Sequence, residues 1–150
     1  MRTLLIMAGL AAALGLAGCE QSKSEATEAT PAPKPSLSRP AQMYAGQEDI
    51  VSIDAASIAL DKGGLVLKAD GKAAAPGYTH PGFLPRINVA APPDGIYEVD
   101  VVADRPSGQA AQAATPIKVT GDWTPYPEGR LKGVRFMTKT NSVVAMLPKG

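Results

Sequence analysis

Turn signals from residue 46 onward constrain the fold more than any other feature of the chain. Fifteen glycines and fourteen prolines occur among its 150 residues. Such residues favour chain reversals and shorten the regular elements between them, so long helices are disfavoured. The clearest turn signals are Asp61-Lys62-Gly63-Gly64, Asp70-Gly71, Pro92-Pro93-Asp94-Gly95, Arg105-Pro106-Ser107-Gly108, Gly121-Asp122 and Thr140-Asn141-Ser142.

Short runs with strand character lie between these turns. Within residues 96–103, Tyr97, Val99 and Val101 fall on one face of an extended chain. Glu98 and Asp100 fall on the other face, and this alternation predicts a half-buried strand. The expected strands are 57–60 and 65–69, which would form a hairpin, and then 84–90, 96–103, 115–120, 131–140 and 143–147.

Two of these runs and one further segment carry more specific expectations. In residues 131–140, Val134 and Phe136 should point inward, with Arg135, Met137 and Lys139 outward. Residues 143–147 are apolar on both faces, which favours a central strand or one covered on both sides. Residues 46–57 fit neither period cleanly, so a short helical turn and another strand both remain open.

These elements predict an all-β fold over residues 46–150. About 105 residues are enough for one domain with a real core and too few for two. Seven short strands with no convincing helix favour a single antiparallel β-sandwich, for which an immunoglobulin-like arrangement is one form.

Charge is unevenly spread within this domain. Residues 94–104 carry four acidic side chains and no basic one before Arg105, whereas residues 130–150 carry five basic side chains and no acidic one. We expect the two strands to be neighbours, with opposite charges facing across the ladder. If they lie apart, the domain has one acidic and one basic face, and a charged partner is the alternative.

Residues 20–44 differ in composition from everything that follows. They are rich in Ser, Thr, Ala, Glu and Pro, and include Pro31, Pro33, Pro35 and Pro40. Such a segment cannot bury enough apolar surface to offset chain entropy. We therefore expect an extended tether over residues 19–45, with a Pro-rich recognition segment as the alternative.

The first eighteen residues have the plan of a signal peptide. Arg2 is followed by an uncharged apolar run from Leu4 to Ala17. Fourteen residues make a helix of about 21 Å, which is shorter than the ~30 Å hydrocarbon core of a bilayer. The run therefore predicts a secretion signal over residues 1–18 rather than a permanent membrane span.

The end of this segment, Leu16-Ala17-Gly18-Cys19, resembles the lipobox of bacterial lipoproteins. The resemblance implies cleavage between Gly18 and Cys19, diacylglyceryl transfer to the Cys19 thiol, and acylation of the freed amino group with a fatty acid such as palmitate. Glu20 follows, where an aspartate would often signal inner-membrane retention. The resemblance thus implies the outer membrane, facing the periplasm, with the inner membrane and the cell surface as alternatives.

Composition narrows the chemistry of the mature chain. It would carry fourteen acidic and, without Arg2, fourteen basic side chains, which disfavours a nucleic-acid partner. Cys19 is the only cysteine and His80 the only histidine, so a metal site built from several thiolates or imidazoles is excluded by count. No phosphate-loop or dinucleotide motif is present, and we expect neither a cofactor nor an enzymatic activity.

Aromatic side chains supply the best candidates for binding. Four of them lie in two Pro-bearing loop-like segments, beside His80 and Arg86. If both segments meet at one end of the domain, they form a platform for a sugar ring, a peptide or a protein. The alternative is that the rings plug the end of the core. The candidate binding residues are Tyr78, His80, Phe83, Arg86, Trp123 and Tyr126.

The sequence therefore predicts a membrane-anchored envelope lipoprotein whose domain binds or scaffolds another envelope component. One alternative is binding of envelope polysaccharide through the aromatic loops. A second is a small hydrolase that uses His80, because a Ser-His-Asp set is arithmetically possible even though no nucleophile-elbow motif surrounds any serine.

Overall fold

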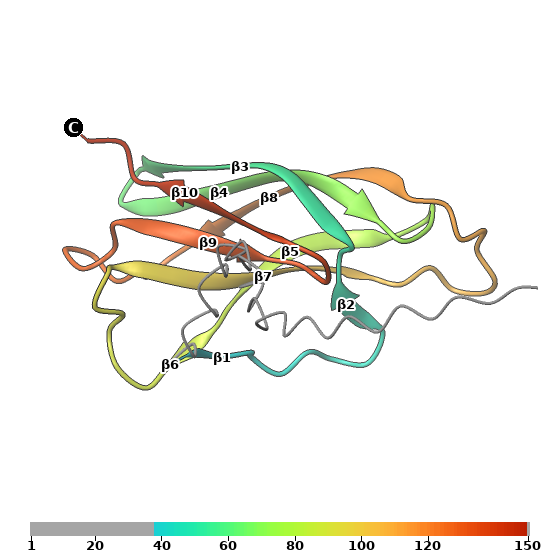
Figure 1. Cartoon of the computed structure of the whole chain (residues 1–150), viewed down its shortest axis with the longest axis horizontal. Helices are drawn as coiled ribbons and strands as arrows, with labels where there is room; N and C mark the ends of the chain where they lie inside the picture. Colours follow the sequence, from blue (N-terminus) through green and yellow to red (C-terminus); the bar gives the residue numbers. More distant parts are fainter. Residues whose placement is uncertain (1–37, 150) are drawn as a thin grey trace, which may run out of the picture. The chain divides into compact units, whose positions relative to one another are not determined.

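The computed structural model describes residues 38–149, which are all-β with no helix (Figure 1). Within that range there is no helix with the length and apolarity needed to cross a membrane. The strands are β1 (Ser38–Arg39), β2 (Gln47–Asp49), β3 (Ser52–Asp61), β4 (Gly64–Ala73), β5 (Thr79–Pro85), β6 (Ile87–Asn88), β7 (Ile96–Asp104), β8 (Thr115–Trp123), β9 (Gly133–Met137) and β10 (Ser142–Met146).

The first of the two larger sheets has the order β3-β4-β8 and is antiparallel throughout. Its hairpin turns at Lys62 and Gly63, whose φ angles of 47° and 81° are the positive pair that a tight two-residue hairpin requires. The expected hairpin is confirmed, and each strand extends beyond its predicted ends.

The second larger sheet is organised around β7. β9 and then β2 pair along one edge of β7, β5 pairs along the other, and β10 lies outside β9. β7 and β9 run parallel, which departs from the purely antiparallel sheet that the sequence predicted. The expectation that the acidic and basic strands are neighbours is confirmed, because Glu98 lies opposite Arg135 in this ladder.

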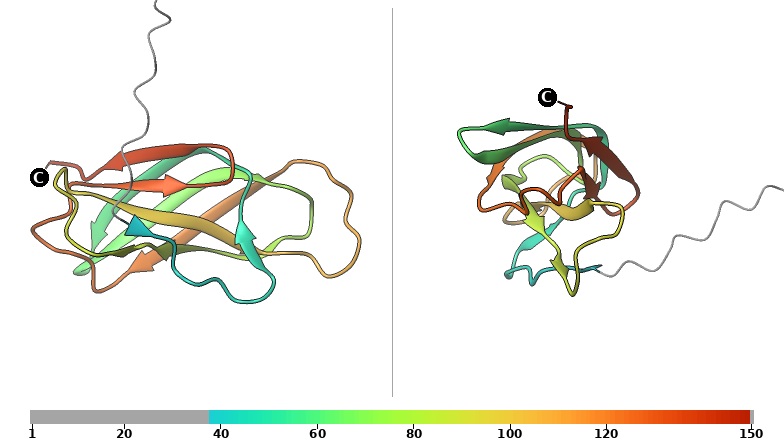
Figure 2. Two further views of the ribbon diagram at one scale, coloured as in Figure 1. Left: turned by 60° about the horizontal axis from the view of Figure 1, so that its bottom comes forward. Right: turned by 90° about the vertical axis from the view of Figure 1, so that its left-hand side faces the viewer.

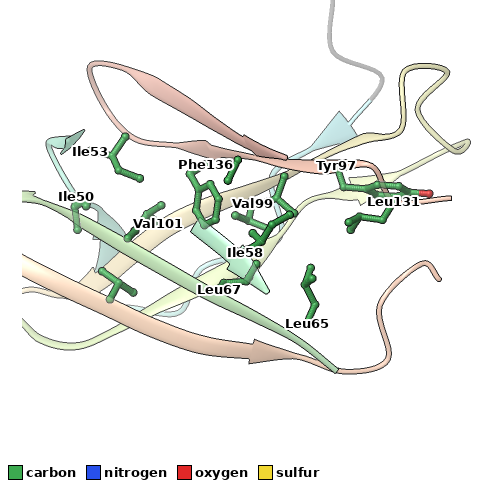
Figure 3. Packing of buried hydrophobic residues seen from close by; sticks show 14 of the residues in the cluster. Ile50, Ile53, Ile58, Leu65, Leu67, Tyr97, Val99, Val101, Leu131 and Phe136 are labelled. Atoms are coloured by element: carbon green, nitrogen blue, oxygen red, sulfur yellow. The ribbon is translucent and has the colours of Figure 1, made fainter. Parts of the chain in front are cut away.

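The core lies between these two sheets and draws side chains from both (Figure 3). Leu65 and Leu67 of β4 meet Val99 of β7 and Phe136 of β9, and all four are at most 1% exposed. Val134 and Phe136 point inward as predicted. Figure 1 shows β3 and β4 on one side of this layer and β5 and β7 on the other.

β7 differs from its prediction, because it is buried on both faces. Its second face carries Glu98 and Asp100, and β1 and Arg86 cover it from outside the core: Ser38 donates a hydrogen bond to Glu98, and Arg86 contacts both carboxylates. β1 lies in the segment that was expected to be tether, and it pairs with β6 in a separate two-stranded sheet.

The prediction for residues 143–147 is wrong. β10 is an edge strand, and only one of its two apolar faces is covered. Ala145 is buried, while Val144 and Met146 are 43% and 58% exposed. The alternation of the strand turns these two side chains outward whatever their hydrophobicity.

Two other segments form less regular structure than expected. Residues 46–57 are strand rather than a helical turn, split between β2 and β3 with Ile50 buried at the break. Residues 84–90 contain the end of β5 and the short β6, and the chain leaves the sheet at Arg86 to reach β1.

Candidate functional site

Tyr78 and Trp123, one from each aromatic segment, lie near opposite ends of β7. Thr79, next to Tyr78, pairs with Asp104 at the end of β7. Trp123 pairs with Leu65, and its ring lies edge-on to Tyr97 near the start of β7, with ring centroids 6.2 Å apart. At about 3.3 Å per residue along β7, this register separates Tyr78 from Trp123 by more than 20 Å, so these two side chains do not share one platform.

The rings themselves pack against the core. Phe83 meets Phe136 edge to face at 5.4 Å between ring centroids. A Cβ atom on Gly121 would lie 3.1 Å from the Phe83 ring, so this ring fills the space above β8. Tyr78, Trp123 and Tyr126 are partly buried against the same cluster. This packing agrees with the alternative to a binding platform, in which the aromatic rings close off the core.

His80 is the sequence candidate that remains most accessible. Its side chain is 80% exposed, and its Nδ1 lies 3.0 Å from Asp104 Oδ2. The backbone there has φ 46°, a left-handed conformation that non-glycine residues adopt at some cost and that clusters at functional sites. The register of β5 against β7 shifts between Thr79 and Gly82, and this irregularity places the imidazole at the sheet end.

An open hollow of about 510 Å³ lies beside this histidine. Arg105 in its wall has a side chain that is 59% exposed. The hollow thus presents an imidazole, a guanidinium and hydroxyl groups around one carboxylate. Its lining residues are Gly77, Thr79, His80, Asp104, Arg105, Pro106 and Ser107.

Two carboxylates organise the polar groups around the hollow. Asp104 accepts a hydrogen bond from the Tyr44 hydroxyl, and this bond raises the pKa of Tyr44. Glu48 accepts from Tyr78 and from Lys139 Nζ at 2.8 Å. Burial raises the pKa of Glu48, but these hydrogen bonds outweigh it and hold the pKa below its usual range.

Burial and the bond to Glu48 raise the pKa of Tyr78 to about 12, so its hydroxyl remains a donor at physiological pH. His80 and Arg105 also contact these carboxylates, since Arg105 Nε lies 3.9 Å from Glu48 Oε2, but their side chains remain largely exposed at the hollow. The sequence placed His80 and Tyr78 among its candidates but missed Asp104, Glu48, Tyr44 and Arg105, which come from distant parts of the chain.

Arg86 has a structural position rather than a place at this hollow. Its Nε and Nη2 donate to Asp100 Oδ1 at 2.9 and 2.7 Å, and its Nη1 lies 3.8 Å from Glu98. Arg135 donates to the other oxygen of Glu98 at 2.9 Å. We call Arg86, Glu98, Asp100 and Arg135 the buried ion cluster. It ties β7 to β9 and to the chain that leaves β5.

Asp49 lies beside this cluster. Asp49 lies opposite Val102 of β7 in the antiparallel ladder. Because Asp100 is two residues before Val102 on the same strand, the Asp49 and Asp100 side chains lie on the same face of the sheet. One oxygen of each carboxylate, Asp49 Oδ1 and Asp100 Oδ2, is buried without a hydrogen-bond partner among the described residues. Burial and the charge of Asp100 raise the pKa of Asp49.

This raised pKa has a consequence for stability. The folded chain binds a proton at Asp49 more tightly than the unfolded chain, so the stabilisation is complete below the ordinary aspartate pKa of 3.8 and is lost as pH rises through the raised value. Asp49→Asn removes that loss. The unfolding free energy of the variant, minus that of the parent, should therefore increase with pH between about 4 and 7.

Urea unfolding at a series of pH values would measure this difference. The matched control is Asp54→Asn, which changes an exposed aspartate on β3. A difference for Asp49→Asn that is flat across the series, or that tracks the control, would show that the fold does not raise the pKa of Asp49.

The described residues contain no group of three or more His, Cys, Asp or Glu side chains that could hold a metal ion. Gly18 and Cys19, the proposed cleavage and lipidation positions, lie outside the described residues. Comparisons with family models, with curated proteins and with solved structures found no match.

Proposed function

We propose that this chain is a bacterial cell-envelope lipoprotein, cleaved after Gly18 and anchored through acyl chains on Cys19. Its β domain binds or scaffolds another envelope component on the periplasmic face of the outer membrane. The observation that carries the proposal is Leu16-Ala17-Gly18-Cys19, directly after a signal-type apolar run and at the only cysteine. Two or three acyl chains give stable attachment where one holds only marginally.

The domain is proposed to be a β-sandwich of immunoglobulin-like type. In support, two larger sheets share one core to which both contribute alternating side chains. The parallel pairing of β7 with β9 is a departure from a purely antiparallel arrangement. It lets β2 continue the same edge of β7 where β9 ends.

We place the binding surface at the His80 hollow. The exposed imidazole and the Arg105 guanidinium project there from backbone that β5 and β7 hold in place, so little backbone order must be gained on binding. Binding is favoured over hydrolysis because, among the described residues, His80 has a hydrogen bond to Asp104 and none to Ser107. Polysaccharide binding through the aromatic loops loses its support, since the rings pack against the core.

Site-specific photocrosslinking in living cells tests this surface. A photoreactive side chain at Thr79, which is exposed in the hollow, should give a discrete adduct that fractionates with the outer membrane. Arg105→Ala should reduce the adduct about tenfold, because one charge-assisted hydrogen bond contributes about that factor to affinity.

The matched control is the same photoreactive group at Ser57, which is exposed on β3 in the other sheet. Adducts of equal yield at both positions, or a Thr79 adduct that Arg105→Ala leaves unchanged, would contradict a binding role for the hollow.

A further inference from the structure

A loop with exposed apolar side chains projects from the domain next to the β1–β6 pair. Figure 1 and the right-hand view of Figure 2 show this pair on the side of the domain that faces away from β3 and β4. Val89 is 89% exposed, the highest value among the large hydrophobic residues of the described chain, and Ile87 is 47% exposed. We call residues 87–93 the apolar loop. It contains no charged residue and continues through Ala90, Ala91, Pro92 and Pro93.

The apolar loop has a defined shape. β6 holds the first residues of the loop in a ladder with β1. At the other end of the loop, where the chain returns to the domain, a turn from Pro92 to Gly95 is closed by a backbone hydrogen bond of 3.0 Å. Gly95 adopts φ 74°, which favours glycine at this point. An ordered protrusion therefore presents these exposed apolar side chains together. Single apolar residues scattered over a surface are ordinary, but a group presented in this way calls for a functional explanation.

The tether enters the domain at this same place. Ser38 pairs with Asn88 and Arg39 with Ile87, so the segment leading back to Cys19 begins directly beside the apolar loop. Residues 20–37 can span about 60 Å at most when fully extended, at ~3.3 Å per residue. A chain anchored at Cys19 thus keeps the loop within reach of the bilayer, at a high local concentration that makes a weak contact effective.

The polar groups around the loop are compatible with a lipid surface. Arg39 is exposed opposite Ile87, and Lys132 lies at the base of the loop, where its backbone N–H donates to the Gly95 carbonyl oxygen at 2.9 Å. Asp94 is the one acidic side chain between Arg86 and Ile96, and its carboxylate accepts the Ile96 N–H at 3.0 Å. Cations near the headgroup phosphates and apolar side chains below them are the pattern of interfacial contacts.

We propose that the apolar loop inserts Val89 and Ile87 into the headgroup region of the bilayer that holds the Cys19 acyl chains. The inference rests on the proposed lipid anchor and adds a second, non-covalent membrane contact. β7 starts next to the apolar loop and ends at Asp104, so the loop and the His80 hollow lie near opposite ends of this strand, about 25 Å apart along it.

The proposed membrane contact can be tested with a single introduced thiol, because Cys19 is the only cysteine of the chain. Because acylation consumes the Cys19 thiol, Val89→Cys gives the mature lipoprotein one free thiol for an environment-sensitive fluorophore. The labelled, lipidated protein is reconstituted in vesicles of phosphatidylethanolamine and phosphatidylglycerol, with and without brominated acyl chains. Insertion predicts a blue-shifted emission that the bromines quench, at about 5–10 Å below the headgroup surface.

Met146→Cys is the matched control, because Met146 is also an exposed apolar side chain, on the edge strand β10. A label there should keep the emission of a water-exposed dye and escape quenching. If the label at position 89 behaves like this control while the protein floats with the vesicles, the membrane-contact inference is overturned and the lipid anchor stands.

If the purified chain carries no N-terminal lipid by mass spectrometry and does not float, the anchor and the contact fail together. The remaining outcome is a label at position 89 that is exposed on vesicles but shielded in intact cells. That result assigns the apolar loop to a protein partner and rejects the bilayer as its occupant.

Discussion

Replacing Arg86 by methionine should lower the free energy of unfolding by about 3–5 kcal/mol. The substitution keeps an unbranched side chain but removes the guanidinium, which leaves Asp100, 1% exposed, without the two donors at 2.9 and 2.7 Å. A buried carboxylate cannot recover these bonds from water, so it must remain unpaired or take up a proton. Urea unfolding followed by the fluorescence of Trp123, the only tryptophan, measures the loss.

Two further variants separate this effect from the loss of a surface charge. Arg130→Met removes an exposed cation and should change stability by less than about 0.5 kcal/mol. Adding Asp100→Asn to Arg86→Met should recover part of the loss, because the orphaned group is then neutral. If Arg86→Met unfolds at the same urea concentration as Arg130→Met, the buried ion cluster does not stabilise the fold as described.

Substituting Cys19 by serine should abolish lipid attachment and leave a precursor that retains residues 1–18. A hydroxyl is a far weaker nucleophile than a thiol, so diacylglyceryl transfer has no acceptor at that position. Metabolic labelling with a radioactive fatty acid should show incorporation in the parent and none in Cys19→Ser. Mass spectrometry should find the mature parent beginning at acylated Cys19.

A displaced thiol provides the control. Ser22→Cys in the Cys19→Ser background restores one cysteine three residues beyond the lipobox, and it should not be labelled if the motif rather than the thiol alone is recognised. Fatty-acid labelling of Cys19→Ser at the parental level would refute the lipoprotein assignment.

Local chemistry explains which parts of the fold could be predicted. The β3–β4 hairpin follows from the turn at Lys62-Gly63 and from the alternation on either side, both of which are visible in consecutive residues. The inward positions of Val134 and Phe136 follow from a period of two in the same way. The pairing of β7 with β9 was accessible as well, because charge complementarity between two segments does not depend on knowing the topology.

Contacts between distant segments explain the errors. β7 was expected to be half-buried because Glu98 and Asp100 are charged, yet Arg86, Arg135 and Ser38 cover them from three other places in the chain. β10 was expected to be covered because both its faces are apolar, but sheet order, which its own residues do not encode, put it at an edge. A periodic pattern reports which residues share a face and not what lies against that face.

The candidate site was predicted only in part for the same reason. His80 stood out by being the single histidine, and the structure places it at an exposed, left-handed backbone position beside Asp104. The turn signal at Arg105-Pro106 marked the other wall of the hollow, although nothing in the sequence joined it to His80. Arg86 was a candidate because it lies near the aromatic residues in the sequence. It is only six residues after His80, but it belongs to the buried ion cluster and not to the hollow.

The short β1–β6 ladder also determines how the domain responds to mechanical load. Pull exerted through the tether reaches β1 first, and two ladder pairs with the Ser38 to Glu98 hydrogen bond are what resist it there. When they peel, residues 38–43 are released, up to Tyr44, whose hydroxyl donates to Asp104, and they add about 20 Å of reach at ~3.3 Å per residue. The ion pairs between Glu98 and Arg135 and between Asp100 and Arg86 remain in place, so the core stays closed. If the chain is anchored at Cys19 as proposed, this junction lengthens under load before the two larger sheets separate.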